Sequence, residues 1–264
     1  MEQAIDSQPP ILLWAVPRSV STAFEKTFSR RHDFDVLHEP FTDCYYFSRD
    51  RRSDRYGDQP DRSAYTAMSA YEAVFRPTPK RTFVKELCFQ AEPYLDQAFI
   101  ERVTSTFIIR SPEAVLNSLI PLKPDFTEDE FGYTAMERVW KRVTSACSSP
   151  PVVIEGDRFR NSPRETLEVY CQLIGVPFIA QMLYWQDGAI RNWEPHERES
   201  QAKWHYALES SHSIVPAVPV RKTTIPSYLR VAFRTAERIY EMIANSPGAV
   251  SAQKARSQVS LGGD

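Results

Sequence analysis

A junction between a strand and a helix near the start of the chain carries residues suited to bind an anion. Residues 11–16 are apolar and end at a proline, which is typical of a buried parallel strand, and a helical pattern runs over 21–31. Arg18 and Ser19 lie between them, and two more hydroxyl side chains, Ser21 and Thr22, open the helix. The first N–H groups of a helix lack intrahelical partners and point beyond its start. The junction therefore predicts a site for phosphate or sulfate oxygens.

A second junction of the same kind occurs later in the chain. A strand pattern covers 105–109, Arg110 follows it directly, and Pro112 suits the first turn of the next helix. In an open α/β sheet the carboxyl ends of the strands face the ligand, so we expect Arg110 to face the same ligand as Arg18. Taken alone, the first junction is equally compatible with an ordinary capped helix beside a solvated arginine. The second, taken alone, is more often explained by a surface arginine and a serine inside a helix.

Titratable side chains follow two further predicted strands. His38 and Glu39 come directly after strand 34–37, and Lys85 ends strand 82–85. A carboxylate or an imidazole at this edge of the sheet can accept a proton, and an ammonium group can stabilise negative charge. The structural alternatives are a packed histidine and ion pairs without a chemical role.

The order of the patterns predicts one α/β domain with three layers, α/β/α, around a mostly parallel central sheet. Strands are expected at 11–16, 34–37, 82–85, 105–109 and 152–155, and helices at 21–31, 64–75, 112–119, 131–146, 163–174 and 225–244. Residues 48–62 are rich in Arg, Asp and Tyr without apolar periodicity, which indicates a loop and a candidate lid. We expect the domain to cover 1–245 and the polar residues 246–264 to form a disordered tail.

The composition excludes several functional classes. Of the 264 residues 42% are hydrophobic, which excludes wholesale disorder, and the net charge of −2 gives no general field that attracts nucleic acid or an acidic membrane. The four cysteines lie far apart, so neither a metal cluster nor a disulfide framework is expected. The longest apolar run, 11–16, is too short to span a bilayer, and the start of the chain does not resemble a signal peptide, so we expect a cytoplasmic protein.

The two junctions together resemble the donor site of sulfotransferases that use 3′-phosphoadenosine 5′-phosphosulfate (PAPS). The stretch from Pro17 to Thr22 is similar to the family's 5′-phosphosulfate loop, Pro-Lys/Arg-Ser-Gly-Thr/Ser-Thr/Ser, except that Val20 replaces the usual glycine. Valine does not easily adopt φ > 0, so we expect a loop conformation that accommodates a β-branched side chain. Arg110, followed eight residues later by Ser118, resembles the family's site for the 3′-phosphate.

The resemblance implies a P-loop-like sulfotransferase fold and transfer of the sulfuryl group of PAPS to a hydroxyl or amine of a small-molecule acceptor, without a metal. The implied donor-binding residues are Pro17, Arg18, Ser19, Val20, Ser21, Thr22, Ala23, Arg110, Ser118, Arg221 and Lys222. Glu39 is the favoured base and His38 the alternative, while Arg18 and Lys85 are expected to stabilise charge. The acceptor pocket is expected from 41–75 and the last third of the chain. Trp185, Trp193 and Trp204 are candidates for the wall of an adenine or acceptor pocket, although large aromatic side chains at irregular spacing more often belong to the core.

Two other functions stay open at this point. A P-loop-like small-molecule kinase would use ATP, but the Gly-x-x-x-x-Gly-Lys-Ser/Thr loop of such enzymes is absent. A nucleotide-binding protein of the same fold without turnover is the second alternative. We expect no nucleic-acid or membrane partner, and the sequence leaves a homodimer open.

Overall fold

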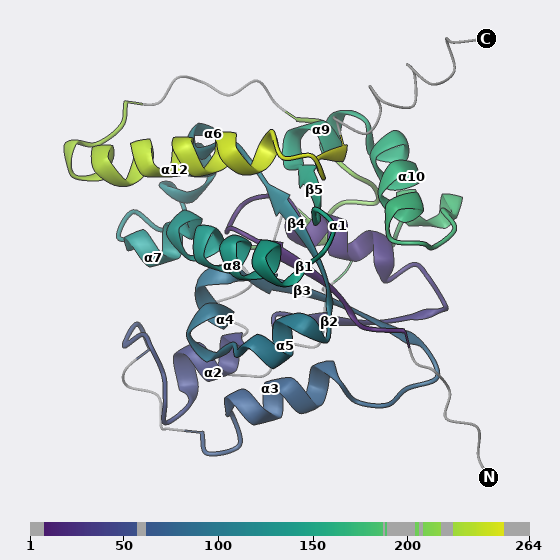
Figure 1. The fold of residues 1–264 in the computed structure, drawn as a ribbon. Coiled ribbons are helices and arrows are strands. Elements are labelled where there is room, and N and C mark those ends of the chain that lie inside the picture. Colours follow the sequence, from purple (N-terminus) through teal and green to yellow (C-terminus); the bar gives the residue numbers. More distant parts are fainter. Residues whose placement is uncertain are drawn as a thin grey trace.

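The computed structural model describes residues 8–56, 62–186, 188, 204–205, 208–217 and 224–250. The predictions on Trp193, Arg221 and Lys222 therefore lie outside the described residues. The described chain contains a sheet of five parallel strands in the order β2-β3-β1-β4-β5, with helices on both faces (Figure 1). The strands are β1 (Ile11–Ala15), β2 (Phe34–His38), β3 (Arg81–Leu87), β4 (Thr104–Ile109) and β5 (Val152–Glu155). This arrangement confirms the predicted α/β fold with its parallel central sheet.

The helices connect the strands and flank the sheet. They are α1 (Ser21–Phe28), α2 (Thr42–Phe47), α3 (Ala67–Val74), α4 (Cys88–Ala91), α5 (Gln97–Glu101), α6 (Pro112–Leu119), α7 (Glu128–Phe131), α8 (Tyr133–Ala146), α9 (Gly156–Asn161), α10 (Pro163–Leu173) and α12 (Arg230–Ala244). Short 3₁₀ helices span Glu92–Tyr94, Ala180–Leu183 and Ser227–Leu229. None of the described helices is long and apolar enough to cross a membrane.

The central strand β1 contributes side chains to two hydrophobic cores, because successive residues of a strand point to opposite faces. Leu12 and Trp14 join a core with side chains of α4, α5, α8 and α12, whereas Leu13 joins a core with side chains of α1 and α10. In the second core the ring of Phe28 stacks on that of Phe83, with centroids 3.9 Å apart. Both cores therefore fix the carboxyl end of β1 from opposite sides.

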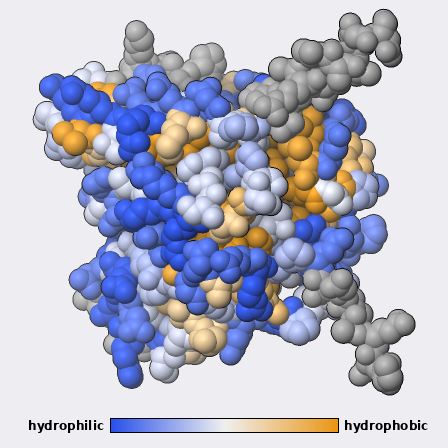
Figure 2. Space-filling model, viewed as in Figure 1, coloured by the Kyte–Doolittle hydropathy of each residue, from blue (hydrophilic) through white to orange (hydrophobic). Residues whose placement is uncertain are grey.

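The last helix covers one core with a single apolar face. The buried residues of α12 are Phe233, Ala236, Ile239 and Ile243, which recur at helical spacing. The outward face of α12 is mostly hydrophilic, whereas a hydrophobic area lies beside α10 (Figure 2).

Three predicted boundaries were wrong for identifiable reasons. Helix 21–31 ends at Phe28, because Arg31 turns inward and donates a hydrogen bond to the carbonyl of Pro177 (2.6 Å). Helix 131–146 is divided at Gly132, which has φ 86°. The predicted tail begins too early, because Gly248 accepts a hydrogen bond from the N–H of Val153 (3.0 Å) and the next two residues are buried beside β5.

Candidate active site

A cavity of about 310 Å³ lies at the carboxyl ends of the strands. Its lining includes Arg18 after β1, Glu39 after β2, Leu87 at the end of β3 and Arg110 after β4. The predicted candidate residues at the ends of these strands therefore line one cavity. Ligands of open α/β sheets generally bind at this edge, outside the carboxyl ends of the strands.

The loop between β1 and α1 has an unusual backbone. Arg18 and Val20 have φ of 61° and 72°, in the left-handed region that favours glycine. The expectation that Val20 would avoid positive φ was therefore wrong. The surrounding contacts hold this conformation: the Ser19 hydroxyl donates to the carbonyl of Val16 (2.7 Å), and the N–H of Phe24 donates to the carbonyl of Val20 (3.1 Å). A strained backbone conformation of this kind persists only where the surrounding contacts hold it in place, and such conformations are often found at ligand sites.

The start of α1 faces the cavity without a side-chain cap. Val20 occupies the N-cap position, where no side chain accepts a hydrogen bond from the first turn, and Ser21, Thr22 and Ala23 line the cavity. At this first junction the alternative of an ordinary capped helix is therefore not supported. The N–H groups of the first turn are directed toward the place where an anion would lie. At the second junction, by contrast, the Ser111 hydroxyl caps α6 by accepting a hydrogen bond from the N–H of Ala114 (3.4 Å).

Two glycines allow neighbouring segments to approach this loop closely. A Cβ atom at Gly132 would lie 2.8 Å from Cδ of Pro17, and one at Gly156 would lie 2.6 Å from the carbonyl oxygen of Ser19. The second contact involves backbone on both sides, so it cannot be relieved by turning a side chain.

Gly156→Ala is accordingly expected to destabilise the protein by about 1–3 kcal/mol, the usual cost of adding a methyl group to a well-packed site. Chemical unfolding of both proteins gives the difference in the free energy of unfolding. An unchanged midpoint and slope would show that the loop shifts freely and that Gly156 does not hold it.

The two predicted arginines lie beside each other at one end of the cavity. Arg110 Nε and Nη2 each lie 2.9 Å from Oδ1 of Asp157, and Arg110 Nη1 donates to the carbonyl of Arg18 (3.2 Å). Arg18 Nε donates to the Ser118 hydroxyl (2.9 Å), and Arg18 Nη1 donates to the carbonyl of Trp204 (2.8 Å). The structure thus brings Arg18, Arg110 and Ser118 together, although Ser118 contacts Arg18 rather than Arg110.

The electrostatics of this pair favour a bound anion. Burial and then the positive charge of Arg110 lower the pKa of Arg18 to about 10. Two neighbouring guanidinium groups repel each other, and an anion with several acceptor oxygens, such as a phosphate or sulfate group, stabilises both by accepting hydrogen bonds from each. Asp157 balances one of the two charges, and the sequence analysis did not identify it, although it lies just after the predicted strand 152–155.

Glu39, just after β2, and Lys85, inside β3, form a buried ion pair; β3 continues to Leu87, two residues beyond its predicted end. Lys85 Nζ contacts Oε1 of Glu39, and the Thr42 hydroxyl lies 3.0 Å from Oε2. Burial alone would raise the pKa of Glu39, but the charges of Lys85 and His38 lower it to about 2. Glu39 is therefore a carboxylate at neutral pH, and like the loop residues it has a positive φ, 45°.

The two histidines near Glu39 have different positions. Nδ1 of His38 lies 2.6 Å from Oε2 of Glu25, and its Nε2 lies 3.7 Å from Oε1 of Glu39. His38 is not among the described residues that line this cavity, whereas His205 is. Burial and then the charge of His38 lower the pKa of His205 to about 3, so its imidazole is neutral at neutral pH. Sequence reasoning missed His205 because it lies in the weakly patterned last third of the chain.

Glu86 is a buried carboxyl group that supports the turn after Glu39. Its Oε2 accepts the N–H of Phe41 (3.0 Å), and its Oε1 accepts the N–H of Leu87 (2.8 Å). Burial, followed by the negative charge of Glu39, raises the pKa of Glu86 to about 8. The folded protein therefore holds a proton on Glu86 that the unfolded chain releases above its ordinary pKa of 4.5.

The sign of the pH dependence follows from this difference. Between pH 4.5 and about 8 the folded state binds the extra proton, so raising the pH lowers the free energy of unfolding. One proton corresponds to at most about 1.4 kcal/mol per pH unit. Glu86→Gln should remove this component and flatten the profile, which urea unfolding at several pH values measures. Profiles of equal slope for the two proteins would contradict the assignment.

These features define a protein of the α/β class with a buried, arginine-rich cavity at the carboxyl edge of its parallel sheet. Residues 10–236 match the family described as the sulfotransferase domain, so the chain belongs to the sulfotransferase family. The predicted family is thereby confirmed. Among the described residues no group of three or more His, Cys, Asp and Glu side chains is placed to hold a metal ion.

Similar proteins come from plants and cyanobacteria. Two curated relatives from Arabidopsis thaliana, branched-chain-amino-acid aminotransferase-like proteins 2 and 1, are 26% and 25% identical over 202 and 182 residues. These matches cover 75% and 67% of this chain but 35% and 32% of the relatives, so the chain spans about a third of their length. The sulfotransferase domain of the Synechococcus PCC 7002 olefin synthase is similar in structure, with a TM-score of 0.53, 14% identity and coverage of 93% and 98%. This last likeness supports the fold.

Proposed function

We propose that this sulfotransferase transfers the sulfuryl group of PAPS to a hydroxyl or amine of a small-molecule acceptor. The observation that carries the proposal is the convergence of Arg18 and Arg110 beside the uncapped start of α1, at one end of a cavity that also contains Glu39. A donor with phosphate groups at two positions of its ribose needs two separate anion sites, and the two strand-to-helix junctions supply them.

The donor would lie across the ends of β1 and β4. The N–H groups at the start of α1, the hydroxyls of Ser21 and Thr22, and Arg18 would hold the 5′-phosphosulfate. Arg110 would hold the 3′-phosphate, and its contact with the carbonyl of Arg18 couples the two sites. Asp157 orients the Arg110 guanidinium through its two contacts with Oδ1.

The chemistry then requires one proton transfer and one exchange of S–O bonds. The acceptor oxygen forms a bond to sulfur, its proton passes to Glu39, and the bond between sulfur and the 5′-phosphate oxygen breaks. Such transfers proceed through loose transition states, in which positioning and charge stabilisation dominate. Protonation of Glu39 weakens its ion pair with Lys85, which frees the ammonium group to stabilise the charge on the leaving phosphate oxygen.

The test is turnover of ³⁵S-labelled PAPS with a panel of alcohols, phenols and amines, alongside γ-labelled ATP with Mg²⁺. Transfer of label from PAPS to an acceptor is the expected result. Binding of 3′-phosphoadenosine 5′-phosphate (PAP) without transfer to any acceptor would favour a non-catalytic nucleotide-binding protein. Transfer of label from ATP instead would identify a kinase.

A further inference from the structure

Part of the cavity is lined by aromatic rings and by one ion pair, between Lys123 and Glu130. We call this region the acceptor subsite and define it by Tyr46, Tyr56, Phe89, Gln90, Lys123 and Glu130. The Thr42 hydroxyl lies 3.0 Å from Oε2 of Glu39 and 2.7 Å from Oε1 of Gln90, so the subsite adjoins the proposed base directly. The rings of Tyr46 and Tyr56 pack edge to face, with centroids 5.2 Å apart, and form one wall.

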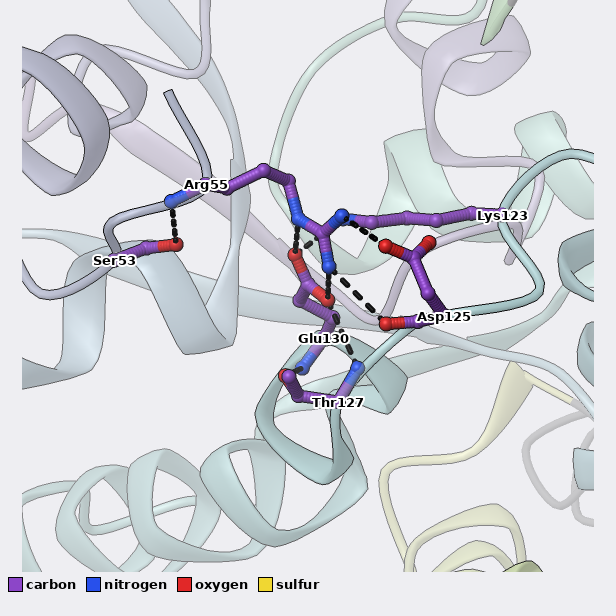
Figure 3. A network of polar contacts seen from close by, with 6 residues as sticks. All are labelled: Ser53, Arg55, Lys123, Asp125, Thr127 and Glu130. Carbon is purple, nitrogen blue, oxygen red and sulfur yellow. Dashed lines mark hydrogen bonds and ion pairs between the residues drawn. The ribbon is translucent and has the colours of Figure 1, made fainter. Parts of the chain in front are cut away.

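The charges of the acceptor subsite are matched within the protein. Arg55 binds Glu130 through two hydrogen bonds, from Nε to Oε1 (2.7 Å) and from Nη2 to Oε2 (2.8 Å). Lys123 Nζ contacts the same Oε1 of Glu130, and Arg55 Nη1 donates to Oδ2 of Asp125 (2.9 Å). Figure 3 shows Arg55 and Lys123 reaching Glu130 from different segments of the chain. Two cations and two carboxylates therefore balance each other.

Glu130 is the centre of this arrangement. It is 5% exposed, and Lys123 is 9% exposed, so water screens their contact only weakly. Burial would raise the pKa of Glu130, but hydrogen bonds from Arg55 and Lys123 lower it, so the group stays ionised. A carboxylate on an acceptor would find Arg55 and Lys123 already paired with Glu130, and the negative charge of Glu130 would repel it. An ammonium group would find the Glu130 carboxylate already occupied by two cations.

We propose, on the basis of the sulfuryl transfer proposed above, that the acceptor is an uncharged alcohol or phenol with an aromatic or other apolar body. Glu130 determines this preference by neutralising Arg55 and Lys123, while Tyr46, Tyr56 and Phe89 contact the apolar body. The role of Glu130 is therefore selection of the acceptor, and it takes no part in the transfer itself.

Glu130→Gln tests the proposal because it removes the charge with little change of shape. Glu130 forms a capping box with Thr127 at the start of α7, and glutamine serves equally well in that motif. The probes are 2-naphthol and 6-hydroxy-2-naphthoate, which share a ring system and a hydroxyl but differ by one carboxylate. Their dissociation constants are measured by calorimetry for the full chain, with and without PAP.

The wild-type protein is expected to bind 2-naphthol more tightly than 6-hydroxy-2-naphthoate. Glu130→Gln should change the ratio of the two dissociation constants by about tenfold or more in favour of the naphthoate, because hydrogen bonds to charged groups contribute that much to affinity. Glu128→Gln, the same change at an exposed position of α7, is the matched control and should keep the wild-type ratio. A wild-type preference for the naphthoate, an unchanged ratio in Glu130→Gln, or no binding of either probe would overturn the proposal. The arm without PAP tests the subsite even if the protein does not bind PAP, so the two proposals fail separately.

Discussion

Glu39→Gln is expected to slow single-turnover sulfuryl transfer by about 10²–10⁴-fold, the usual cost of losing a positioned general base. Glutamine keeps the shape of the side chain and its contact with Thr42 but cannot take the acceptor's proton. The affinity for PAP should change little, because Glu39 lies at the end of β2, away from the two arginines at β1 and β4. Rapid mixing with saturating PAPS, on any acceptor that shows turnover, measures the chemical step.

The neighbouring histidines supply the controls for this prediction. His38→Asn should slow the step much less, because Nδ1 of His38 is held by Glu25 and the side chain does not line the cavity. His205→Asn tests the neutral imidazole that does line it. If His205→Asn abolished transfer while Glu39→Gln slowed it less than about tenfold, well below the range for a general base, His205 would be the base.

Arg110→Ala is expected to weaken PAP binding by about 10- to 150-fold, which corresponds to the loss of hydrogen bonds to a charged group. Adenosine 5′-phosphosulfate, which lacks the 3′-phosphate, should bind the variant and the wild-type protein about equally. Calorimetric titration of both nucleotides against both proteins gives four affinities. Comparing the loss of affinity for PAP with that for adenosine 5′-phosphosulfate gives the contribution of Arg110 to binding of the 3′-phosphate.

Arg110 also donates a hydrogen bond to the carbonyl of Arg18, so a purely structural role must be distinguished. Arg110→Lys keeps the charge but loses the planar fork, and it should recover part of the PAP affinity. Equal weakening of both nucleotides by Arg110→Ala would mean that the residue only supports the loop around Arg18, and the 3′-phosphate assignment would be wrong.

The sheet and its functional edge were predictable because each strand contains a short apolar run with a polar residue at its end or shortly after it. Arg18, Glu39 and Arg110 stand at such points, and the carboxyl ends of parallel strands necessarily meet at one edge. Helix α6 was predicted with its observed bounds, since Pro112 opens it and its apolar spacing is regular. The helices α2, α4, α5 and α9 were not predicted, because elements of four to six residues are too short to show a period.

The partners of the site residues were not predictable from the sequence. Asp157 was not predicted as the partner of Arg110, and Ser118, predicted beside Arg110, instead binds Arg18, which lies 100 residues earlier. Only the packing of β4, β5 and α6 brings these groups together. The positive φ of Val20 was not predictable either, because β-branched residues disfavour this conformation. Tertiary contacts, such as the close approach of Gly156 to Ser19, offset the conformational free-energy cost. Local preference predicted one conformation, and the surrounding fold imposes another.

Calorimetric titration of the wild-type protein with PAP, AMP and ATP–Mg²⁺ shows whether two separate anion sites recognise a nucleotide with phosphates at the 3′ and 5′ positions of its ribose. AMP shares the adenosine and the 5′-phosphate of PAP and lacks only the 3′-phosphate that Arg110 is proposed to hold. We expect PAP to bind without Mg²⁺ and about 10- to 150-fold more tightly than AMP. Equal binding of PAP and AMP, or tighter binding of ATP–Mg²⁺, would contradict this expectation.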